Sequence, residues 1–243
     1  LRAGLRVASR GVRAGSLSGA HAITGGLGGL SLRAAALTLG HGGAGVVLAS
    51  RSGRVARGGQ GLEAQLASVR AMAEGRLALV ACDAADGRQV RLVLEAAVRV
   101  GGPLCAMLHA AGLLRDQLLR TTPLADVAAV LAPKASAAAW LHSDAAQWPL
   151  GAVLLFSSTS AALGNLGQAS YAAANAYLDT LALCRRSVGL AGRGVQWPLV
   201  TGAGMGQATL DSLRAGRAAD IARWSLSLEE YAAVVLCALA THA

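Results

Sequence analysis

The sequence predicts an α/β fold in which a doubly wound parallel sheet is covered by helices on both faces. Short, nearly continuous apolar runs alternate along the chain with longer stretches rich in alanine and leucine. Continuous apolar strands that are each followed by a helix are typical of parallel sheets buried on both sides. A glycine-rich turn links the first run to the first stretch, which fits the same arrangement.

Six apolar runs are expected to be strands because they contain no Asp, Glu, Lys or Arg: Ala20–Thr24, Gly45–Ser50, Leu77–Cys82, Cys105–His109, Ala152–Ser157 and Gly194–Trp197. The stretches between them are longer and rich in strong helix formers. They predict five helices: Leu30–Leu39, Leu62–Glu74, Arg88–Val100, Leu124–Leu141 and Ala169–Val188. Ser227 and Glu230 form a capping box that predicts a last helix ending near Thr241.

Composition limits the class of protein. At 243 residues the chain is long enough for one large domain with a buried core. No uninterrupted apolar run reaches the roughly 18 residues of a membrane span, so we expect a soluble chain. The four cysteines lie far apart without a CxxC pair, which predicts no metal site, no disulfide framework and a reducing compartment.

The net charge of +9 raises the question of nucleic-acid binding. The arginines are scattered, aromatic residues make up only 3% and no recognition motif is present, so we expect no nucleic-acid partner. Residues 1–62 contain eight arginines and no acid, which resembles an organellar transit peptide. Because Leu1 is not a methionine, residues 1–19 are more simply a lead-in from a preceding segment. The expected location is the cytoplasm, or an organelle such as the plastid if residues 1–19 are a targeting segment.

The glycine-rich turn is the first candidate site. Thr24-Gly25-Gly26-Leu27-Gly28-Gly29-Leu30 follows the first expected strand and opens the first expected helix. In such a turn, glycines let the backbone approach a pyrophosphate, and the helix N-terminus supplies amide donors. Ser31 occupies the place of the last glycine, where a small residue still allows close helix–strand packing. The turn therefore predicts a dinucleotide site in a Rossmann-like fold.

The end of the second strand distinguishes between the two nicotinamide cofactors. An NAD enzyme is expected to carry an acid there, whereas an arginine accommodates the 2′-phosphate of NADP. The chain has Ser50-Arg51-Ser52 at this point and no acid before Glu63. The alternative is that Arg51 is one more surface arginine, but the missing acid favours NADPH as the cofactor.

Polar and small residues end the third and fourth strands, at the edge where ligands bind in open parallel sheets. Cys82-Asp83 ends the third strand, and Asp83 is a candidate acceptor for the adenine amino group. His109-Ala110-Ala111-Gly112 ends the fourth strand, with small residues that leave room for a cofactor. We assign His109 to this edge, but as a structural histidine with satisfied hydrogen bonds rather than an acid or base.

The chain contains one lysine, Lys134, against 21 arginines. A single ammonium group in such a chain indicates a site where a guanidinium, with its different shape and hydration, would not serve. The alternative is a lysine left by chance on the surface. Three polar residues favour catalysis: Ser158 follows the fifth strand, and Tyr171 and Asn175 lie one turn apart on the next helix.

These residues and their neighbours resemble a known family. Phe156-Ser157-Ser158 and the segment from Tyr171 to Asn175 resemble the catalytic half of a ketoreductase domain from a modular polyketide synthase. Such domains are members of the short-chain dehydrogenase/reductase superfamily. The resemblance extends from about Ala20 to Gly206. Free-standing relatives usually carry Tyr-x-x-x-Lys, but here Asn175 takes that position and the lysine comes from Ala132-Pro133-Lys134, as is typical of synthase-embedded reductases.

The resemblance implies NADPH-dependent reduction of a β-ketoacyl thioester, carried by the phosphopantetheine arm of an acyl carrier domain, within a polyketide or fatty acid synthase. Other synthase domains would belong to the same polypeptide. Tyr171 would give the proton, and Ser158 would hydrogen-bond the carbonyl oxygen. Lys134 would hold the nicotinamide ribose and stabilise the phenolate, whose pKa is ordinarily about 10. Asn175 would order a relay of water and lysine.

The segment after Gly112 bears on stereochemistry. Similar reductases that form the D-configured β-hydroxyl carry Leu-Asp-Asp where this chain has Leu114-Arg115-Asp116, so Leu114 and Asp116 match. The opposite class is marked by a tryptophan at the position of Leu163. The resemblance therefore implies a D-hydroxy product, with Leu114 and Asp116 guiding the substrate. The alternative is that Asp116 only caps local structure.

Several departures affect the substrate entrance. Leu166 and Ser170 stand where such domains often have proline and asparagine, and Pro198 and Val200 replace a glycine and a tryptophan. These changes bear on substrate choice rather than on the fold.

The cofactor-free half that normally precedes the catalytic half is also missing, so residues 20–243 are interpreted as an NADP-binding catalytic domain cut from a multienzyme. Two alternatives remain. The exchange of Lys134 and Asn175 argues against a free-standing reductase of small ketones, and the complete catalytic set argues against a silent NADP-binding scaffold.

Overall fold

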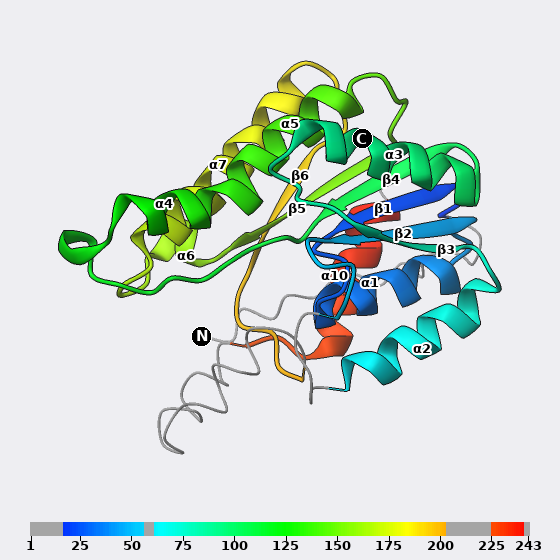
Figure 1. The fold of residues 1–243 in the computed structure, drawn as a ribbon, viewed down its shortest axis with the longest axis horizontal. Helices are drawn as coiled ribbons and strands as arrows, with labels where there is room; N and C mark the ends of the chain where they lie inside the picture. The colour runs from blue at the N-terminus through cyan, green and yellow to red at the C-terminus, as the bar shows by residue number, and fades with distance from the viewer. Residues whose placement is uncertain (1–16, 56–60, 203–224, 241–243) are drawn as a thin grey trace.

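A computed structural model describes residues 17–55, 61–202 and 225–240 of the chain (Figure 1). Their sheet is wholly parallel, with strand order β3-β2-β1-β4-β5-β6. The strands are β1 (Ala20–Thr24), β2 (Gly45–Ser50), β3 (Leu77–Ala81), β4 (Leu104–His109), β5 (Ala152–Ser158) and β6 (Arg193–Trp197). The order reverses between β1 and β4, so the predicted doubly wound, Rossmann-like fold is confirmed.

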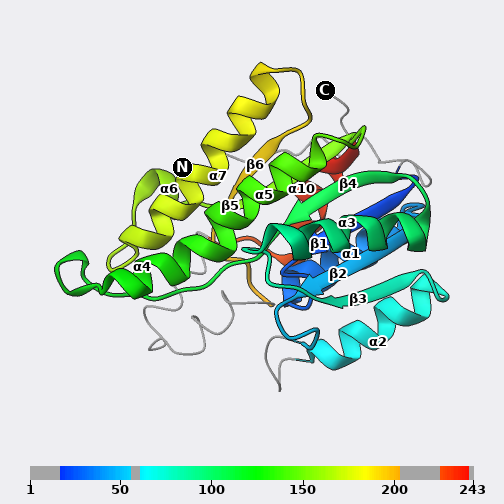
Figure 2. The ribbon, with the colours of Figure 1, turned by 45° about the horizontal axis from the view of Figure 1, so that its top comes forward.

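Helices cover both faces of the sheet. One face carries α1 (Gly29–Gly40), α2 (Leu62–Ala73) and α10 (Leu228–Ala240). The other carries α3 (Gly87–Gly101), α4 (Leu124–Leu131), α5 (Ala137–Ala145) and α7 (Ala169–Ser187). Figures 1 and 2 show these two layers with the sheet between them.

Alternation along the strands explains the two layers. In β2, Val46 and Leu48 belong to the core beneath α1, α2 and α10, whereas Val47 and Ala49 belong to the core beneath α3, α5 and α7. All four are buried, because neighbouring strand residues point to opposite faces and both faces are covered. For this reason, apolar residues follow one another without interruption in these strands instead of alternating with polar residues.

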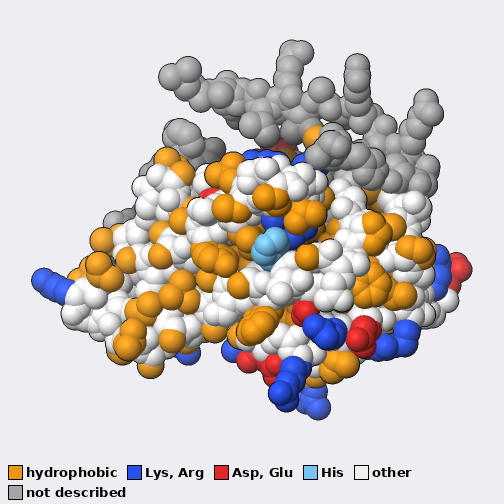
Figure 3. Space-filling view, turned by 90° about the horizontal axis from the view of Figure 1, so that it is seen from above, with side chains coloured by type: hydrophobic (Ala, Val, Ile, Leu, Met, Phe, Trp, Pro, Cys, Tyr) orange, Lys and Arg blue, Asp and Glu red, His pale blue; other side chains and the backbone are white. Residues whose placement is uncertain are grey.

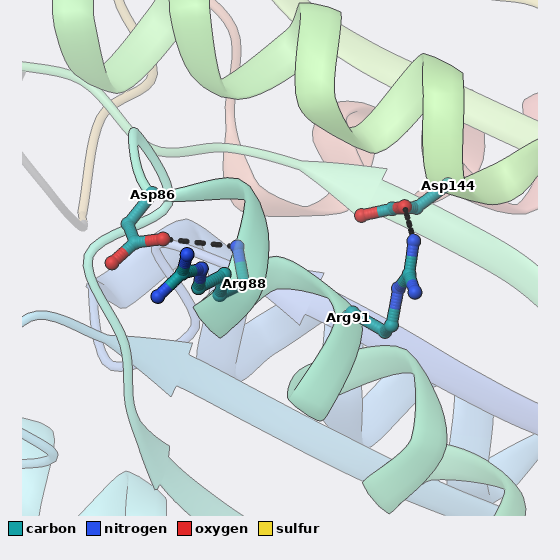
Figure 4. Close-up of polar contacts among 4 residues, drawn as sticks. All are labelled: Asp86, Arg88, Arg91 and Asp144. Atoms are coloured by element: carbon teal, nitrogen blue, oxygen red, sulfur yellow. Dashed lines mark hydrogen bonds and ion pairs between the residues drawn. The ribbon is translucent and has the colours of Figure 1, made fainter.

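The helices on the second face are joined by polar contacts at their ends (Figure 4). The Asp86 side chain caps α3 by accepting a hydrogen bond of 2.9 Å from the Arg88 backbone N–H. One turn further on, Arg91 forms an ion pair of 3.1 Å with the mostly buried Asp144 of α5. The ion pair ties α3 to α5, whereas the cap acts within α3.

The expected helix over residues 124–141 is longer and less regular than predicted. It runs as α4, a π-helical turn η2 (Ala132–Ser136) and α5. Pro133 has no backbone N–H and disrupts the regular i→i−4 pattern, and the Ala137 N–H instead bonds the Ala132 carbonyl, five residues back. The turn directs Lys134 into the interior, where only 3% of it is exposed.

The same stretch bears on the expectation that no uninterrupted apolar run is long enough to span a membrane. Among the described residues, Leu124–Ala145 is one helical stretch long and apolar enough to cross a membrane by length and composition, with a mean hydropathy of 1.3. It is not an uninterrupted apolar run, because Asp126, Lys134 and Asp144 lie within it. Lys134 and Asp144 are both buried in the fold.

Smaller differences concern element ends. Strand β3 ends at Ala81 instead of Cys82, and the short helices α6 (Ser160–Leu163) and η1 (Leu119–Thr121) were not expected. The capping box of α10 is confirmed, since the Glu230 N–H donates to the Ser227 hydroxyl and the Ser227 N–H to the Glu230 carboxylate. Most of the expected lead-in and the segment around Gly204-Met205 lie outside the described residues.

Candidate active site

A cavity of about 760 Å³ opens at the carboxyl edge of the sheet, beside the switch point between β1 and β4. This volume is typical of a small-molecule or cofactor site. Most of the residues predicted to bind a cofactor line it: Thr24, Gly25, Leu27, Gly28, Gly29, Leu30, Ser50, Arg51, Ser52, Cys82, Asp83, Ala110, Ala111 and Gly112. Among the predicted set, Gly26, His109 and Lys134 do not lie on its wall.

The glycine turn fits a dinucleotide because close packing excludes side chains from it. Gly25 has φ +68°, and a Cβ there would come within 2.6 Å of the Ala111 backbone nitrogen. A Cβ on Gly26 would lie 2.7 Å from the Ile23 carbonyl oxygen, so Gly26 serves packing rather than the cavity. A Cβ on Gly28 would make only an ordinary contact, 3.5 Å from the Gly25 carbonyl oxygen, and α1 begins at the next residue with its N-terminal amides toward the cavity.

The turn after β2 brings two arginines to the cavity. Arg51 and Arg54 both line it, together with the two serines between which Arg51 stands. The turn is held locally: the Ser52 hydroxyl accepts from the Arg54 N–H at 3.2 Å, and Gly53 adopts φ +64°. Arg54 was missed in the sequence, although its spacing of three residues from Arg51 across a glycine was available as a signal.

His109 is completely buried behind the cavity. Its Nε2 lies 3.1 Å from the Lys134 backbone oxygen, and its Nδ1 lies 2.6 Å from the Thr24 hydroxyl. Because the carbonyl can only accept, Nε2 carries the proton and Nδ1 accepts from Thr24. Burial, followed by the nearby Lys134 charge, lowers the pKa of His109 to about 3. The expectation of a satisfied structural histidine is confirmed.

A second cavity of about 310 Å³ adjoins the first, and Leu30, Ala110, Leu114 and Phe156 line both. It brings together three of the four predicted catalytic residues, Lys134, Ser158 and Tyr171. The fourth, Asn175, is fully buried behind them, where its side-chain nitrogen donates to the Tyr171 carbonyl at 2.8 Å. Its side-chain oxygen is buried without a protein partner.

The Lys134 side chain lies against two other elements, β5 and α7. The Nζ donates to the Phe156 carbonyl at 2.8 Å and lies 5.4 Å from the centre of the Tyr171 ring. Burial lowers the pKa of Lys134 to about 7, while the negative charge of Asp179 on α7 acts to raise it. With this pKa, Lys134 changes between its ammonium and its neutral form near pH 7. Its side chain lies close to Tyr171, and both residues line the second cavity.

The protonated form of Tyr171 is favoured. Burial raises the pKa of its phenol, and the charge of Asp116 adds to this, while hydrogen bonds with Asn175 and Ser158 act in the opposite direction. A tyrosine whose pKa lies above its ordinary value keeps its proton at neutral pH. This is the state required of a proton donor.

The residues predicted to guide the substrate lie at the cavity entrance. Leu114 lines both cavities, whereas Asp116 lies outside their walls. The Asp116 carboxylate accepts from the Gln168 side chain at 3.0 Å, and the Gln117 N–H donates to the Gly167 carbonyl at 2.9 Å. The loop after β4 is therefore fastened to the segment that leads into Tyr171.

Comparison with known proteins agrees with this geometry. The family model of the ketoreductase (KR) domain matches residues 19–202. The chain belongs to this family. It is a ketoreductase domain of the kind found in modular polyketide synthases, within the short-chain dehydrogenase/reductase superfamily.

Two synthases illustrate the relationship. Polyketide synthase GfsB of Streptomyces halstedii is 44% identical over 177 residues, which cover 73% of this chain and 3% of the synthase. The pikromycin synthase component PikAIII of Streptomyces venezuelae is 39% identical over 190 residues, which cover 78% of this chain and 12% of that protein. The ketoreductase thus matches a small part of each multienzyme. Both sources are bacteria, so nothing here supports the plastid alternative.

Solved structures show the same relationship. An A1-type ketoreductase superposes with a TM-score of 0.79 at 32% identity, covering 96% of this chain and 48% of its own. A structure of A-type ketoreductases from a modular polyketide synthase gives a TM-score of 0.77 at 33% identity, covering 92% and 46%. This ketoreductase chain therefore spans about half the length of these relatives.

Aromatic residues of the site were largely missed in the sequence. Phe156 lines both cavities, and Trp197 lines the second. Their ring centres lie 5.4 Å apart, and both pack on Tyr231 of α10, whose hydroxyl donates to the Leu30 carbonyl at 2.8 Å. The only sequence signal was their scarcity, since aromatic residues make up 3% of this ketoreductase.

Proposed function

We propose that this ketoreductase domain uses NADPH to reduce a β-ketoacyl thioester, carried by an acyl carrier domain, to the β-hydroxyacyl form. The observation that carries the proposal is the convergence of Lys134, Ser158 and Tyr171 on one cavity that adjoins a larger, glycine-lined cavity. Two adjoining cavities suit a reaction between a bound cofactor and a ketone.

The larger cavity has the features that NADPH needs. The backbone of the glycine turn would hold the pyrophosphate, and Asp83 the adenine. Arg51, assisted by Arg54, would hold the 2′-phosphate through charge-assisted hydrogen bonds. Bound NADPH would supply the hydride and its two electrons.

The protein would supply the proton and the position of the ketone. Ser158 and Tyr171 would both donate to the ketone oxygen, which fixes the carbonyl carbon for hydride attack. As negative charge develops on that oxygen, the Tyr171 proton moves to it and an alkoxide never has to persist. Lys134 stabilises the resulting phenolate and would hold the nicotinamide ribose. Asn175 would orient a water molecule between its buried oxygen and the lysine.

The setting of the domain is part of the proposal. Residues 20–243 would act as the catalytic unit, preceded by a lead-in at residues 1–19, within a cytoplasmic polyketide synthase. The neighbouring partners would be the acyl carrier domain, with its phosphopantetheine arm, and further synthase domains on the same polypeptide. The match to synthase parts in bacteria supports this setting.

The decisive experiment supplies the purified protein with acetoacetyl-carrier protein and either NADPH or NADH. The expected result is stoichiometric conversion of NADPH to NADP⁺ with formation of 3-hydroxybutyryl-carrier protein, detected by mass spectrometry, and much slower use of NADH. Cofactor binding without any reduced product would favour the scaffold alternative instead.

A further inference from the structure

Exposed leucines occur on two segments at the entrance of the second cavity, which holds Lys134, Ser158 and Tyr171 and is called the catalytic cavity below; among these leucines, Leu163 lines its wall. Of the eleven large hydrophobic residues that are exposed in the described parts of the chain, five lie on the two segments around this entrance. We call them the leucine rim: Leu118, Leu119, Leu124, Leu163 and Leu166. Leu124, Leu163 and Leu166 are the most exposed of the five, with 83%, 83% and 86% of their surface exposed. An exposed apolar patch of this kind on a folded protein marks a binding surface.

The two segments are distant in sequence but fastened together. The hydrogen bonds from Gln117 to Gly167 and from Gln168 to Asp116 join the loop before α4 to the segment after α6. Figures 1 and 2 both place the start of α4 and α6 at the same end of the molecule. Figure 3 shows hydrophobic side chains spread over the upper face, including that end, where a Lys or Arg side chain also projects, while most of the visible charged side chains lie farther from it.

The rim is continuous with the site of reaction. Leu163 lines the catalytic cavity together with Ser158 and Tyr171, and Leu114 extends the apolar wall toward the larger cavity. A substrate whose ketone oxygen bonds Ser158 and Tyr171 must extend its remaining atoms through this entrance. The rim therefore lies within reach of the substrate.

The two arms of a β-ketoacyl thioester differ in chemistry, and so do the two parts of the entrance. The thioester arm is rich in amides, which suits the polar pair Asp116 and Gln168. The acyl tail is a hydrocarbon, which suits leucines. Resting on the proposed function above, we propose that the leucine rim binds the acyl tail, so that this ketoreductase prefers medium to long, apolar β-ketoacyl chains over short ones.

The size of the effect follows from burial of methylene groups. Each methylene that is fully removed from water contributes about 0.8 kcal/mol, or roughly fourfold in binding, and half-burial on an open rim gives about twofold. We therefore expect kcat/KM of the unmodified protein to rise about twofold for each added methylene, which is about sixtyfold over the six methylenes that separate a four-carbon from a ten-carbon chain.

The experiment measures kcat/KM with NADPH on N-acetylcysteamine thioesters of straight β-ketoacyl chains from four to ten carbons. The variants are Leu163→Ser with Leu166→Ser, and Leu119→Ser alone. In the double variant the ten-carbon to four-carbon ratio should fall to about threefold or less. Leu183→Ser, at an exposed position on α7 away from the rim, is the matched control and should keep the ratio of the unmodified protein.

The outcomes separate the two proposals. A flat dependence on chain length in the unmodified protein, or a ratio unchanged in the double variant, would overturn the role of the rim while leaving ketone reduction intact. No turnover of any thioester would instead refute the proposed function. A defect confined to carrier-bound substrates, with normal small thioesters, would assign the rim to the carrier domain and also overturn the inference. If the double variant unfolds, Leu119→Ser decides by the same ratio.

Discussion

At the scale of single residues, the site depends on protonation states that burial sets. Tyr171 keeps its proton because burial raises its pKa, whereas Lys134 is brought close to neutrality because burial lowers its pKa to about 7. These opposite shifts have one cause, since a buried site disfavours the charged form of either group. The pair can therefore exchange charge at little cost during proton transfer.

Removing the transferable proton should stop the reaction. Tyr171→Phe should lower kcat by at least about a thousandfold while the Kd for NADPH changes less than about threefold, because only the hydroxyl is lost.

The Lys134→Arg variant should also be severely impaired, since a planar guanidinium does not fit the contact with the Phe156 carbonyl. Single-turnover kinetics and cofactor fluorescence titration test both. Near-normal turnover of Lys134→Arg would refute the role given to the only lysine.

The pH dependence should report Lys134. Since the ammonium form is the active one, kcat/KM should fall as pH rises through about 7, while the raised pKa of Tyr171 keeps the phenol protonated in this range. Asp179→Asn removes the negative charge that raises the pKa of Lys134, so the decline should begin at lower pH. Gln196→Ala loses only the 2.8 Å hydrogen bond to Asp179 and should leave the profile in place. Identical profiles for all three proteins would contradict this account.

Stereochemistry is also decided by few residues. Leu114 lines both cavities, and Asp116 lies outside them but holds Gln168, which lines the second cavity. We predict a D-configured β-hydroxyl product, and we expect Asp116→Ala to lower the stereochemical purity by releasing Gln168. Chiral chromatography of the reduced thioester measures both. A predominantly L-hydroxy product would overturn this assignment.

At the scale of elements, irregular geometry places the catalytic lysine. Pro133 produces the π-helical turn η2, and the turn points Lys134 inward. His109 on β4 then bonds the Lys134 carbonyl and the Thr24 hydroxyl at the end of β1. The lysine is thereby linked to the glycine turn through a buried side chain that stays neutral. The position of Lys134 is therefore set jointly by η2, β4 and β1.

Helix α10 offers a clean test at this scale, because its capping box is separate from the catalytic residues. Ser227→Ala should cost about 1 kcal/mol, which lowers Tm by roughly 2–4 °C in a domain of this size. Ser68→Ala removes a hydroxyl that bonds within α2 and is not a cap, so it should change Tm by less than about 2 °C. Calorimetry compares the two, and equal shifts would show that the box contributes nothing specific.

At the scale of the whole molecule, cofactor binding couples strands that lie far apart in the sequence. The cavity takes residues from β1, β2 and β5 and from the segments that follow β1, β2, β3 and β4, so a bound cofactor connects most of the sheet. A ligand that binds only the folded state raises stability by mass action. Thermal stability is therefore a readout of cofactor choice that does not depend on turnover.

NADPH should stabilise the protein more than NADH. At about a hundredfold excess over Kd, the gain of roughly 2.7 kcal/mol should raise Tm by about 5–10 °C. Arg51→Ala should remove most of the difference between the two cofactors by deleting a cation that faces the phosphate, whereas Arg70→Ala on the exposed side of α2 should keep it. Equal shifts with NADPH and NADH in the unmodified protein would contradict the prediction of NADP specificity.

The arrangement of strands and helices could be inferred from the residues alone. Apolar runs without charges can only be buried strands here, and the helix formers between them leave few other options, so most expected boundaries lie within one or two residues of the observed ones. The proposed catalytic set could also be picked out, because a single lysine and a Ser–Tyr–Asn spacing are rare enough to stand out. These patterns are local, so they can be interpreted without knowing which elements pack against them.

Other features arose only when the chain folded. The π-helical turn, the burial of His109 against the Lys134 carbonyl, the second arginine of the cavity and the joined leucine rim each depend on contacts between separate elements. Residue type does not reveal them, because hydrogen-bond partners and exposure are set by which segments packing brings together. The residue types alone indicated which reaction to expect. The geometry of the site, the protonation of its buried side chains and the shape of the cavity entrance were decided by the tertiary structure.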